Sequence, residues 1–162
     1  MKNFKLYYID ENYINYLRNF DSNVFYNKDS SRPYIGVVYT YNELNYFAPL
    51  ASPKPKHIDI NPKAIDIFKV KNGELGVVNI NNMIPSPIET LTEVLPTITD
   101  EKYKKLLEGQ LTFLNNNKAK LMKKINHFQN MYRKGHLFPN ILERCCNFPL
   151  LEEKFGEYIN KK

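Results

Sequence analysis

The chain has 162 residues, of which 43% are hydrophobic and 14% aromatic. This length suits a single domain with a real core, and the apolar content excludes disorder over most of the chain. The 23 lysine and arginine residues exceed the 17 acidic residues, giving a net charge of +6. An excess of this size permits nucleic-acid binding without requiring it.

No sequence signal indicates secretion, a membrane span or a bound cofactor. Cys145 and Cys146 are adjacent, which disfavours a disulfide and leaves no zinc spacing, so we expect two small buried thiols. No apolar run is long enough for a signal peptide or a transmembrane helix. No phosphate-binding glycine motif is present, and His57, His127 and His136 lie in unrelated segments. We therefore expect a cytoplasmic protein that uses no metal or other cofactor.

The first fifty residues predict a strand and a helix, followed by two strands paired as a hairpin. Asp10 suits a helix N-cap, and apolar residues then recur at helical spacing. A polar segment favours a loop before the hairpin. The expected elements are a strand over 4–9, a helix over 11–20, a loop over 21–32, a strand over 34–41, a turn over 42–45 and a strand over 46–50.

A second hairpin is expected over residues 65–80, closed by the sequence Lys71-Asn72-Gly73-Glu74. Asn-Gly is favoured at the centre of a type I′ turn, where both residues need positive φ. The remaining expected elements are a strand over 88–95, helices over 100–117, 118–133 and 150–159, and a short helical turn over 139–146. The sequence thus predicts one α+β domain over residues 1–162, with a twisted antiparallel sheet of five or six strands and about four surrounding helices.

The stretch Y-F-A-P-L-A-S-P-K-P-K-H, residues 46–57, joins the end of a strand to a run of prolines. Each proline fixes φ, lacks an N–H donor and holds the preceding residue extended, so a stiff loop is expected. Donors and cations placed in advance suit a polyanion site. The alternative is a solvated connector. The functional groups of this loop are those of Ser52, Lys54, Lys56 and His57.

These residue types suit cleavage of RNA without a metal, because the substrate supplies its own nucleophile, the 2′-hydroxyl. The protein must then assist proton transfer and stabilise charge on the phosphate. Ser52, Lys54 and His57 offer a hydroxyl, a cation and a group that titrates near neutrality. Arg32 precedes the strand expected to pair with the loop's own strand, and its planar fork suits bidentate contact with the same phosphate.

Three short motifs in order resemble the ToxN/AbiQ family of endoribonuclease toxins from type III toxin–antitoxin systems. They are R-P-Y-I-G-V-V, A-P-L-A-S-P-K followed by His, and C-N-F-P-L-L-E-E-K-F. The similarity runs from about Phe4 to Phe155. The resemblance implies an antitoxin made of repeated RNA, and an active site lined by Ser52, Lys54 and the basic Arg32.

The resemblance also implies that Tyr13 lies near the RNA, although its apolar helical face favours a core position. Two positions depart from the family pattern. Relatives carry Thr where this chain has Ala51, and a catalytic Tyr where this chain has Glu108, two residues before Gln110. The second departure leaves proton transfer open to His57, Tyr13 or Glu108.

A stretch without acidic residues runs between Gly109 and Leu142. On a helix, the lysines of this stretch would form a basic face that can follow phosphates while aromatic rings stack on unpaired bases. The ordinary alternative is a solvated helix face. The residues expected to contact RNA are Lys56, Lys118, Lys120, Lys123, Lys124, His127, Arg133 and Lys134.

We therefore expect a sequence-selective, metal-independent endoribonuclease that leaves a 2′,3′-cyclic phosphate and a 5′-hydroxyl. A cognate small antitoxin RNA, which the enzyme also processes, is expected to inhibit it in a closed protein–RNA assembly. Cellular or phage RNA would be the substrate. The alternative is a non-catalytic RNA-binding module that uses the same basic surface.

Overall fold

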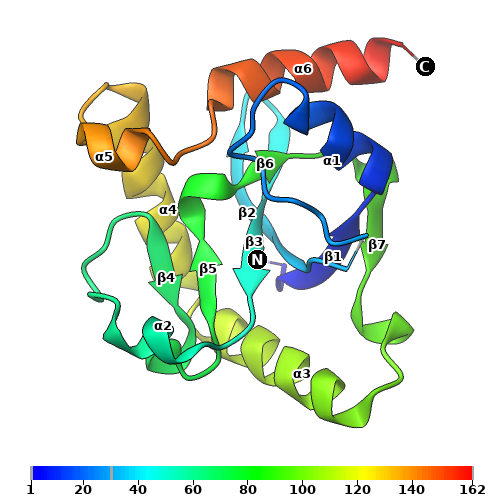
Figure 1. Ribbon diagram of the computed structural model, residues 1–162, viewed down its shortest axis with the longest axis vertical. Coiled ribbons are helices and arrows are strands. Elements are labelled where there is room, and N and C mark those ends of the chain that lie inside the picture. Colours follow the sequence, from blue (N-terminus) through cyan, green and yellow to red (C-terminus); the bar gives the residue numbers. More distant parts are fainter. Residues whose placement is uncertain (1, 30, 162) are drawn as a thin grey trace.

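The computed structural model describes residues 2–29 and 31–161, which form an α+β unit around an antiparallel sheet (Figure 1). Met1, Ser30 and Lys162, which fall within the expected domain, lie outside the described residues. Within the described ranges the sheet has seven strands, in the order β4-β5-β3-β2-β1-β7, with β6 paired to β3. Their bounds are Lys5–Ile9 (β1), Tyr34–Tyr41 (β2), Leu44–Ala51 (β3), Ile67–Lys69 (β4), Val77–Asn79 (β5), Ile84–Pro85 (β6) and Leu91–Glu93 (β7).

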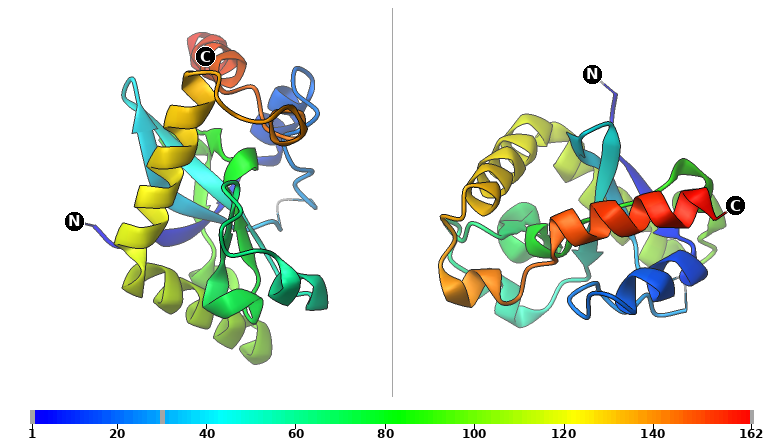
Figure 2. Two further views of the ribbon diagram at one scale, coloured as in Figure 1. Left: turned by 90° about the vertical axis from the view of Figure 1, so that its left-hand side faces the viewer. Right: turned by 90° about the horizontal axis from the view of Figure 1, so that it is seen from above.

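Helices cover one side and both ends of this sheet. Figure 1 shows α3 across the lower end and α1 with α6 across the upper end, and Figure 2 shows α4 running along one side. None of the described helices is long and apolar enough to cross a bilayer. Their bounds are Glu11–Arg18 (α1), Pro55–Asp59 (α2), Glu101–Asn116 (α3), Lys118–Arg133 (α4), Pro139–Leu142 (α5) and Phe148–Asn160 (α6).

The fold class is confirmed, and several elements keep their expected bounds. The strand over 34–41 and the helix over 118–133 match β2 and α4. Asp10 caps α1 by accepting a hydrogen bond from the Tyr13 backbone N–H at 3.3 Å. Asp100 caps α3 in the same way and accepts from the Lys102 backbone N–H at 2.9 Å. These caps supply partners for backbone donors that have none inside the helix.

The expected turns are wrong in detail at both hairpins. The first is tighter than expected, because Asn42 and Glu43 both take positive φ and β3 begins directly after them. The second is longer: its strands shrink to 67–69 and 77–79, and residues 70–76 form the connection. Asn72 and Gly73 both take positive φ, 56° and 89°, as expected for the Asn-Gly pair, and Lys71 does so as well, at 51°. The strand expected over 88–95 is also shorter, because a 3₁₀ turn occupies 88–90.

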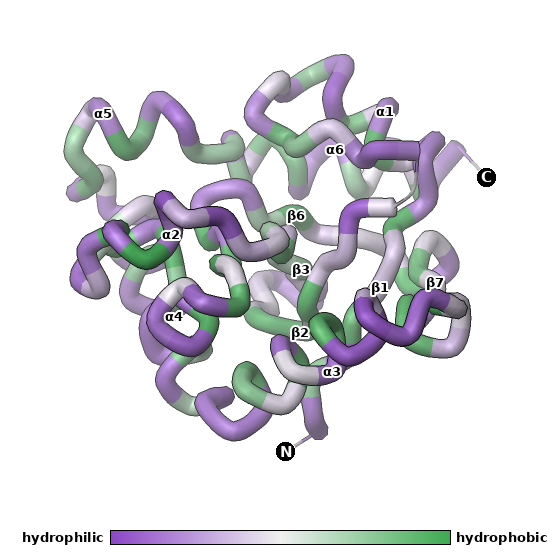
Figure 3. The backbone as a smooth tube through the Cα atoms, turned by 60° about the horizontal axis from the view of Figure 1, so that its bottom comes forward, coloured by the Kyte–Doolittle hydropathy of each residue, from purple (hydrophilic) through white to green (hydrophobic). Residues whose placement is uncertain are grey.

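The core lies between the sheet and the long helices. Figure 3 shows hydrophobic segments gathered on the strands, with hydrophilic stretches on the outer helices. Phe148, at the start of α6, packs edge-on against three rings. Its centroid lies 5.9 Å from that of Tyr46, 6.1 Å from that of Phe128 and 4.7 Å from that of Tyr132. Such pairs add to the free energy gained by burying the rings. The two thiols, Cys145 and Cys146, are free and buried, as expected.

Candidate active site

A cavity of about 640 Å³ lies where the end of β3 meets the segment that leads into β2. Five residues predicted for the site line it, although they come from two separate segments of the chain. Arg32 comes from the segment before β2, and the others follow β3 in the loop and in α2. The five residues are Arg32, Ser52, Lys54, Lys56 and His57.

The loop after β3 is not extended throughout, as the run of prolines had suggested. It turns into the short helix α2, which begins at Pro55, with Lys54 in the N-cap position. Proline is tolerated at the first helical position, because the N–H that it lacks would have had no partner inside the helix. Pro55 therefore starts a helix here and does not prevent one. Ser52 and Lys54 stay in the extended part and are both exposed.

His57 closes the first turn of α2 on itself. Its Nδ1 accepts a hydrogen bond from the Lys54 backbone N–H at 3.1 Å, and its own backbone N–H donates to the Lys54 carbonyl at 2.9 Å. The side chain is only 3% exposed. Burial, followed by the positive charges of Lys56 and Lys54, lowers the pKa of His57, so the imidazole is neutral near pH 7. Since Nδ1 accepts, the ring proton lies on Nε2.

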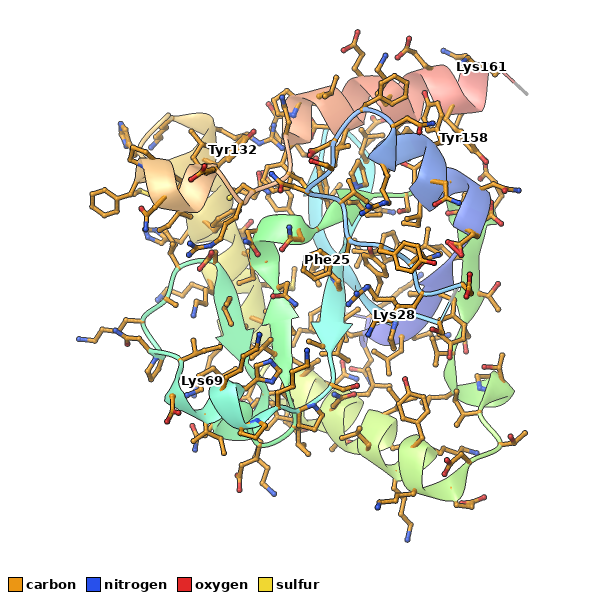
Figure 4. The ribbon with its side chains drawn as sticks, in the orientation of Figure 1. Phe25, Lys28, Lys69, Tyr132, Tyr158 and Lys161 are labelled. Carbon is orange, nitrogen blue, oxygen red and sulfur yellow. The ribbon has the colours of Figure 1, made fainter. Side chains whose placement is uncertain are left out.

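The β4–β5 hairpin holds this loop from below. The Nζ atom of Lys69 donates to the carbonyls of Ile58 and Ile60, at 2.7 and 2.8 Å, and so caps the last turn of α2. Figure 4 shows Lys69 beside this helix. A cation at a helix C-terminus also interacts favourably with the unpaired carbonyls. The loop is therefore tied down at both ends of α2.

Arg32 is held by its own segment. Its Nε donates to the Tyr26 carbonyl at 2.9 Å, and its guanidinium carbon lies 4.7 Å from the centre of the Phe25 ring. Among the described residues, the two terminal nitrogens have no hydrogen-bond partner, so they are left to contact a phosphate. Burial lowers the pKa of Arg32, but a guanidinium remains charged at neutral pH. Asn27, fully buried, anchors this segment by donating to the Ile9 carbonyl at 2.9 Å.

Sequence reasoning missed several other groups that line the cavity. Figure 4 shows two of them, Phe25 and Lys28, in front of the central strands, and two aromatic side chains, Tyr8 from β1 and Tyr103 from α3, complete the wall. No described residue that lines the cavity is acidic, and four of them are lysine or arginine. The sequence offered one signal for them, the basic residue Lys28 in the polar 21–32 segment. The cavity thus combines a strong positive field with rings that can stack on bases.

Two residues discussed for proton transfer do not line the cavity. Tyr13 is completely buried, and its hydroxyl donates to the Pro85 carbonyl at 2.5 Å. Its ring packs edge-on against Tyr158 of α6, with centroids 4.9 Å apart (Figure 4 labels Tyr158). Tyr13 is therefore a core residue that joins α1 to α6. Glu108 is exposed on α3 and does not line the cavity either.

The basic face of α4 is only partly available to a ligand. Lys120, Lys123, His127 and Lys134 are exposed, as an RNA contact requires. Lys118 is less open, with its Nζ 4.8 Å from the centre of the Phe4 ring.

Two of the expected RNA contacts are already engaged within the protein. Arg133 pairs with Glu152 of α6 at 2.8 Å and stacks 3.6 Å from the centre of the Tyr41 ring. The Nζ atom of Lys124 donates to the Pro62 carbonyl at 3.3 Å, and burial lowers the pKa of Lys124. The 110–141 stretch contains no acidic residue, but in the fold Glu152 of α6 pairs with Arg133 within it.

The fold and the cavity define a class of protein: a single α+β domain with a cationic, aromatic-lined pocket at the ends of its central strands, suited to a polyanion. A family model described as "Toxin ToxN, type III toxin-antitoxin system" matches residues 5–156, nearly the whole chain. This protein belongs to that family.

Individual relatives cover almost all of the chain. It is 35% identical to an endoribonuclease ToxN of Bacillus thuringiensis subsp. kurstaki, over 95% of this chain and 84% of the relative. It is 31% identical to the endoribonuclease AbiQ of Lactococcus lactis subsp. lactis, over 97% of this chain and 90% of AbiQ. A solved structure from work in which "a processed non-coding RNA regulates a bacterial antiviral system" superposes with a TM-score of 0.82 and 31% identity, over 94% of this chain and 98% of that one.

Proposed function

We propose that this protein is an endoribonuclease toxin of a type III toxin–antitoxin system and that the cavity around Ser52 is its active site. The observation that carries the proposal is the cavity itself, where a hydroxyl, four cations and two tyrosine rings converge without an acid among the described lining residues. The similarity to relatives named as endoribonucleases extends over nearly the whole of this chain and most of each relative, which supports the same activity here.

The proposed reaction needs no metal. The 2′-oxygen of the substrate attacks the adjacent phosphorus, the bond from phosphorus to the 5′-oxygen breaks, and the proton lost from the 2′-hydroxyl is balanced by one gained at the 5′-oxygen. The products are a 2′,3′-cyclic phosphate and a 5′-hydroxyl. Lys54 and Arg32 would stabilise the charge that develops on the phosphate, and the Ser52 hydroxyl would donate to a non-bridging oxygen.

We assign His57 to holding the loop and not to moving a proton. Its Nδ1 accepts from the Lys54 backbone N–H, so the imidazole holds the Lys54 backbone extended. In this conformation Lys54 lines the cavity. Lys56 and Lys28 add field strength at the rim. The rings of Tyr8 and Tyr103 would stack on the bases that flank the cleaved bond, because every base offers a π face.

The partner is a small antitoxin RNA, and the substrates are cellular or phage transcripts, which would place the protein in the cytoplasm. The antitoxin RNA would occupy the cavity and the exposed lysines of α4, Lys120 and Lys123, in a closed protein–RNA assembly that the toxin itself processes. A structural relative is regulated by a processed non-coding RNA in an antiviral system, which supports a role in phage defence.

Expression with and without the native upstream DNA tests this proposal. With that DNA, a small RNA of repeated sequence should co-purify with the protein. Without it, the protein should arrest growth and degrade cellular RNA, whereas a non-catalytic RNA-binding module would do neither. If the protein expressed alone is harmless, and no RNA co-purifies when the upstream DNA is present, both the proposed endoribonuclease activity and the proposed antitoxin RNA are wrong.

A further inference from the structure

We propose that Gln110, on α3, is a positioning residue for the loop that carries Ser52 and Lys54. The proposal rests on the endoribonuclease function proposed above. It adds a residue that lies outside the cavity and acts on it through the β4–β5 hairpin.

Gln110 is a buried polar side chain with one long-range contact. It is 1% exposed, and its Nε2 donates to the Leu75 carbonyl at 2.7 Å, across 35 positions of sequence. The Leu75 backbone N–H donates in turn to the Val70 carbonyl at 3.1 Å. The Leu75 N–H thus bonds within the 70–76 turn, and Gln110 supplies the partner for the Leu75 carbonyl.

This turn lies directly against the catalytic loop, at both ends of its functional part. A Cβ added to Gly76 would lie 2.0 Å from the Ala51 carbonyl oxygen, and one added to Gly73 would lie 2.5 Å from the His57 carbonyl oxygen. Both glycines have positive φ, 99° and 89°. Only glycine allows so close an approach in that conformation. Ala51 and His57 flank Ser52 and Lys54, so the turn sets where those two side chains stand.

The helix that carries Gln110 also forms the opposite wall of the cavity. Tyr103, two helical turns earlier on α3, lines the cavity. Figure 1 shows α3 running beneath the β4–β5 hairpin, and the Leu75 side chain lies 3.7 Å from a Cβ built on Gly109. The hydrogen bond from Gln110 to Leu75 therefore fixes the separation between the wall at Tyr103 and the loop at Ser52 and Lys54.

Loss of this hydrogen bond should affect chemistry more than RNA binding. Cationic contacts to a flexible RNA tolerate small shifts, whereas a displacement of about 1 Å at reacting groups can cost about 100-fold in rate. Uncoupling the turn from α3 should thus lower the rate constant at saturation and leave the half-saturating concentration unchanged. A residue that serves stability alone would lower the melting temperature without this split.

The experiment compares purified variants by single-turnover cleavage. The sequence cut by the wild-type protein is first mapped on total cellular RNA, and an oligoribonucleotide that contains one cut site is the substrate. Gln110→Met keeps the length of the side chain but removes the donor. We expect its maximal rate to fall about 10- to 100-fold, with half-saturation within twofold of the wild type. Rates are compared well below the melting temperature of every variant.

Gln110→Glu adds a pH-dependent readout, and its melting temperature is measured at each pH so that a loss of rate is separated from a loss of stability. The ionised carboxylate cannot donate to the Leu75 carbonyl, but the protonated acid can. The ratio of its rate to the wild-type rate should therefore rise as pH falls, while the ratio for Gln110→Met stays flat. The matched control is Gln129→Met, which removes another fully buried glutamine from a helix. Gln129 accepts a hydrogen bond from Arg133 Nε at 3.1 Å and lies far from the loop in sequence.

The outcomes separate this inference from the function on which it rests. A wild-type protein that cuts no RNA ends the proposed function itself. A wild-type protein that cuts RNA, with Gln110→Met as fast at saturation or Gln129→Met equally slow, overturns the positioning role. A slow Gln110→Met with unchanged half-saturation, and a Gln110→Glu that recovers at lower pH, support it.

Discussion

Lys54 and His57 hold each other in place through two reciprocal hydrogen bonds. The Lys54 backbone N–H donates to His57 Nδ1 at 3.1 Å, and the His57 backbone N–H donates to the Lys54 carbonyl at 2.9 Å. Both bonds use only the backbone of Lys54, so its ammonium group is left to reach into the cavity. The pair of bonds connects the stability of one short helix, α2, to the position of the cation that we propose acts on the phosphate.

Ser52→Ala and Lys54→Ala should each abolish toxicity and reduce RNA cleavage by at least about 100-fold, as loss of a donor to a developing oxyanion does. Both side chains are exposed, so the melting temperature should change little. Growth after induction and cleavage of an RNA with a mapped cut site measure the effect. Ser22→Ala and Lys161→Ala, which are also exposed and do not line the cavity, are the matched controls. A double variant at Ser52 and Lys54 that still arrests growth would remove the loop from the mechanism.

The unfolding free energy should depend on pH through His57. Its pKa is lower in the folded protein than the ordinary 6.5, so below 6.5 the unfolded chain takes up a proton that the folded protein does not. Stability is therefore lost as pH falls from 6.5 towards the lowered value, with a slope of at most about 1.4 kcal/mol per pH unit. Denaturant titrations should show this slope reduced in His57→Gln. His136→Gln, at an exposed histidine, is the control, and an equal reduction there would contradict the account.

Phe128→Ala should lower the unfolding free energy by about 3–5 kcal/mol, because it empties a fully buried aromatic site that packs on Phe148. Phe138→Ala removes the same ring from a position that is 73% exposed, and should change stability by about 0.5 kcal/mol or less. Chemical denaturation measures both. Similar losses in the two variants would mean that the core does not lie between the sheet and the long helices as described.

Salt dependence should distinguish exposed from engaged cations on α4. In a Ser52→Ala background, which we expect to prevent cleavage, Lys120→Gln and Lys123→Gln should each reduce the slope of log affinity against log salt by about 0.7 for single-stranded RNA. Arg133→Gln should leave that slope unchanged and lower stability instead, because it leaves Glu152 without its cation. A reduced slope in Arg133→Gln would mean that the ion pair opens to bind RNA.

The sequence was informative wherever a local pattern decides the structure. Helical spacing predicted α4 residue for residue, and a run rich in β-branched and aromatic residues predicted β2. The loop after β3 was located correctly, and its Ser52 and Lys54 do reach one cavity with Arg32. Proline stiffness was the misleading part, because Pro55 starts α2.

What the sequence could not predict depends on contacts between distant segments. Tyr103 reaches the cavity because α3 packs against the 70–76 turn, which no local pattern indicates. That turn also takes positive φ at Lys71, in addition to Asn72 and Gly73. Arg133 sits in a stretch without acids, and only the fold brings Glu152 to it. The apolar helical face of Tyr13 predicted a core position, and the residue is fully buried.

The chemical identity of the RNA ends tests the central claim most directly. Wild-type protein, freed of its antitoxin RNA, is incubated with RNA in the presence of EDTA, and the new termini are probed by phosphatase, kinase and ligation. Attack by the 2′-oxygen, assisted by the Ser52, Lys54 and Arg32 side chains, predicts unimpaired cleavage with a 2′,3′-cyclic phosphate and a 5′-hydroxyl. Products with a 3′-hydroxyl, or cleavage lost on chelation and restored by Mg²⁺, would contradict it.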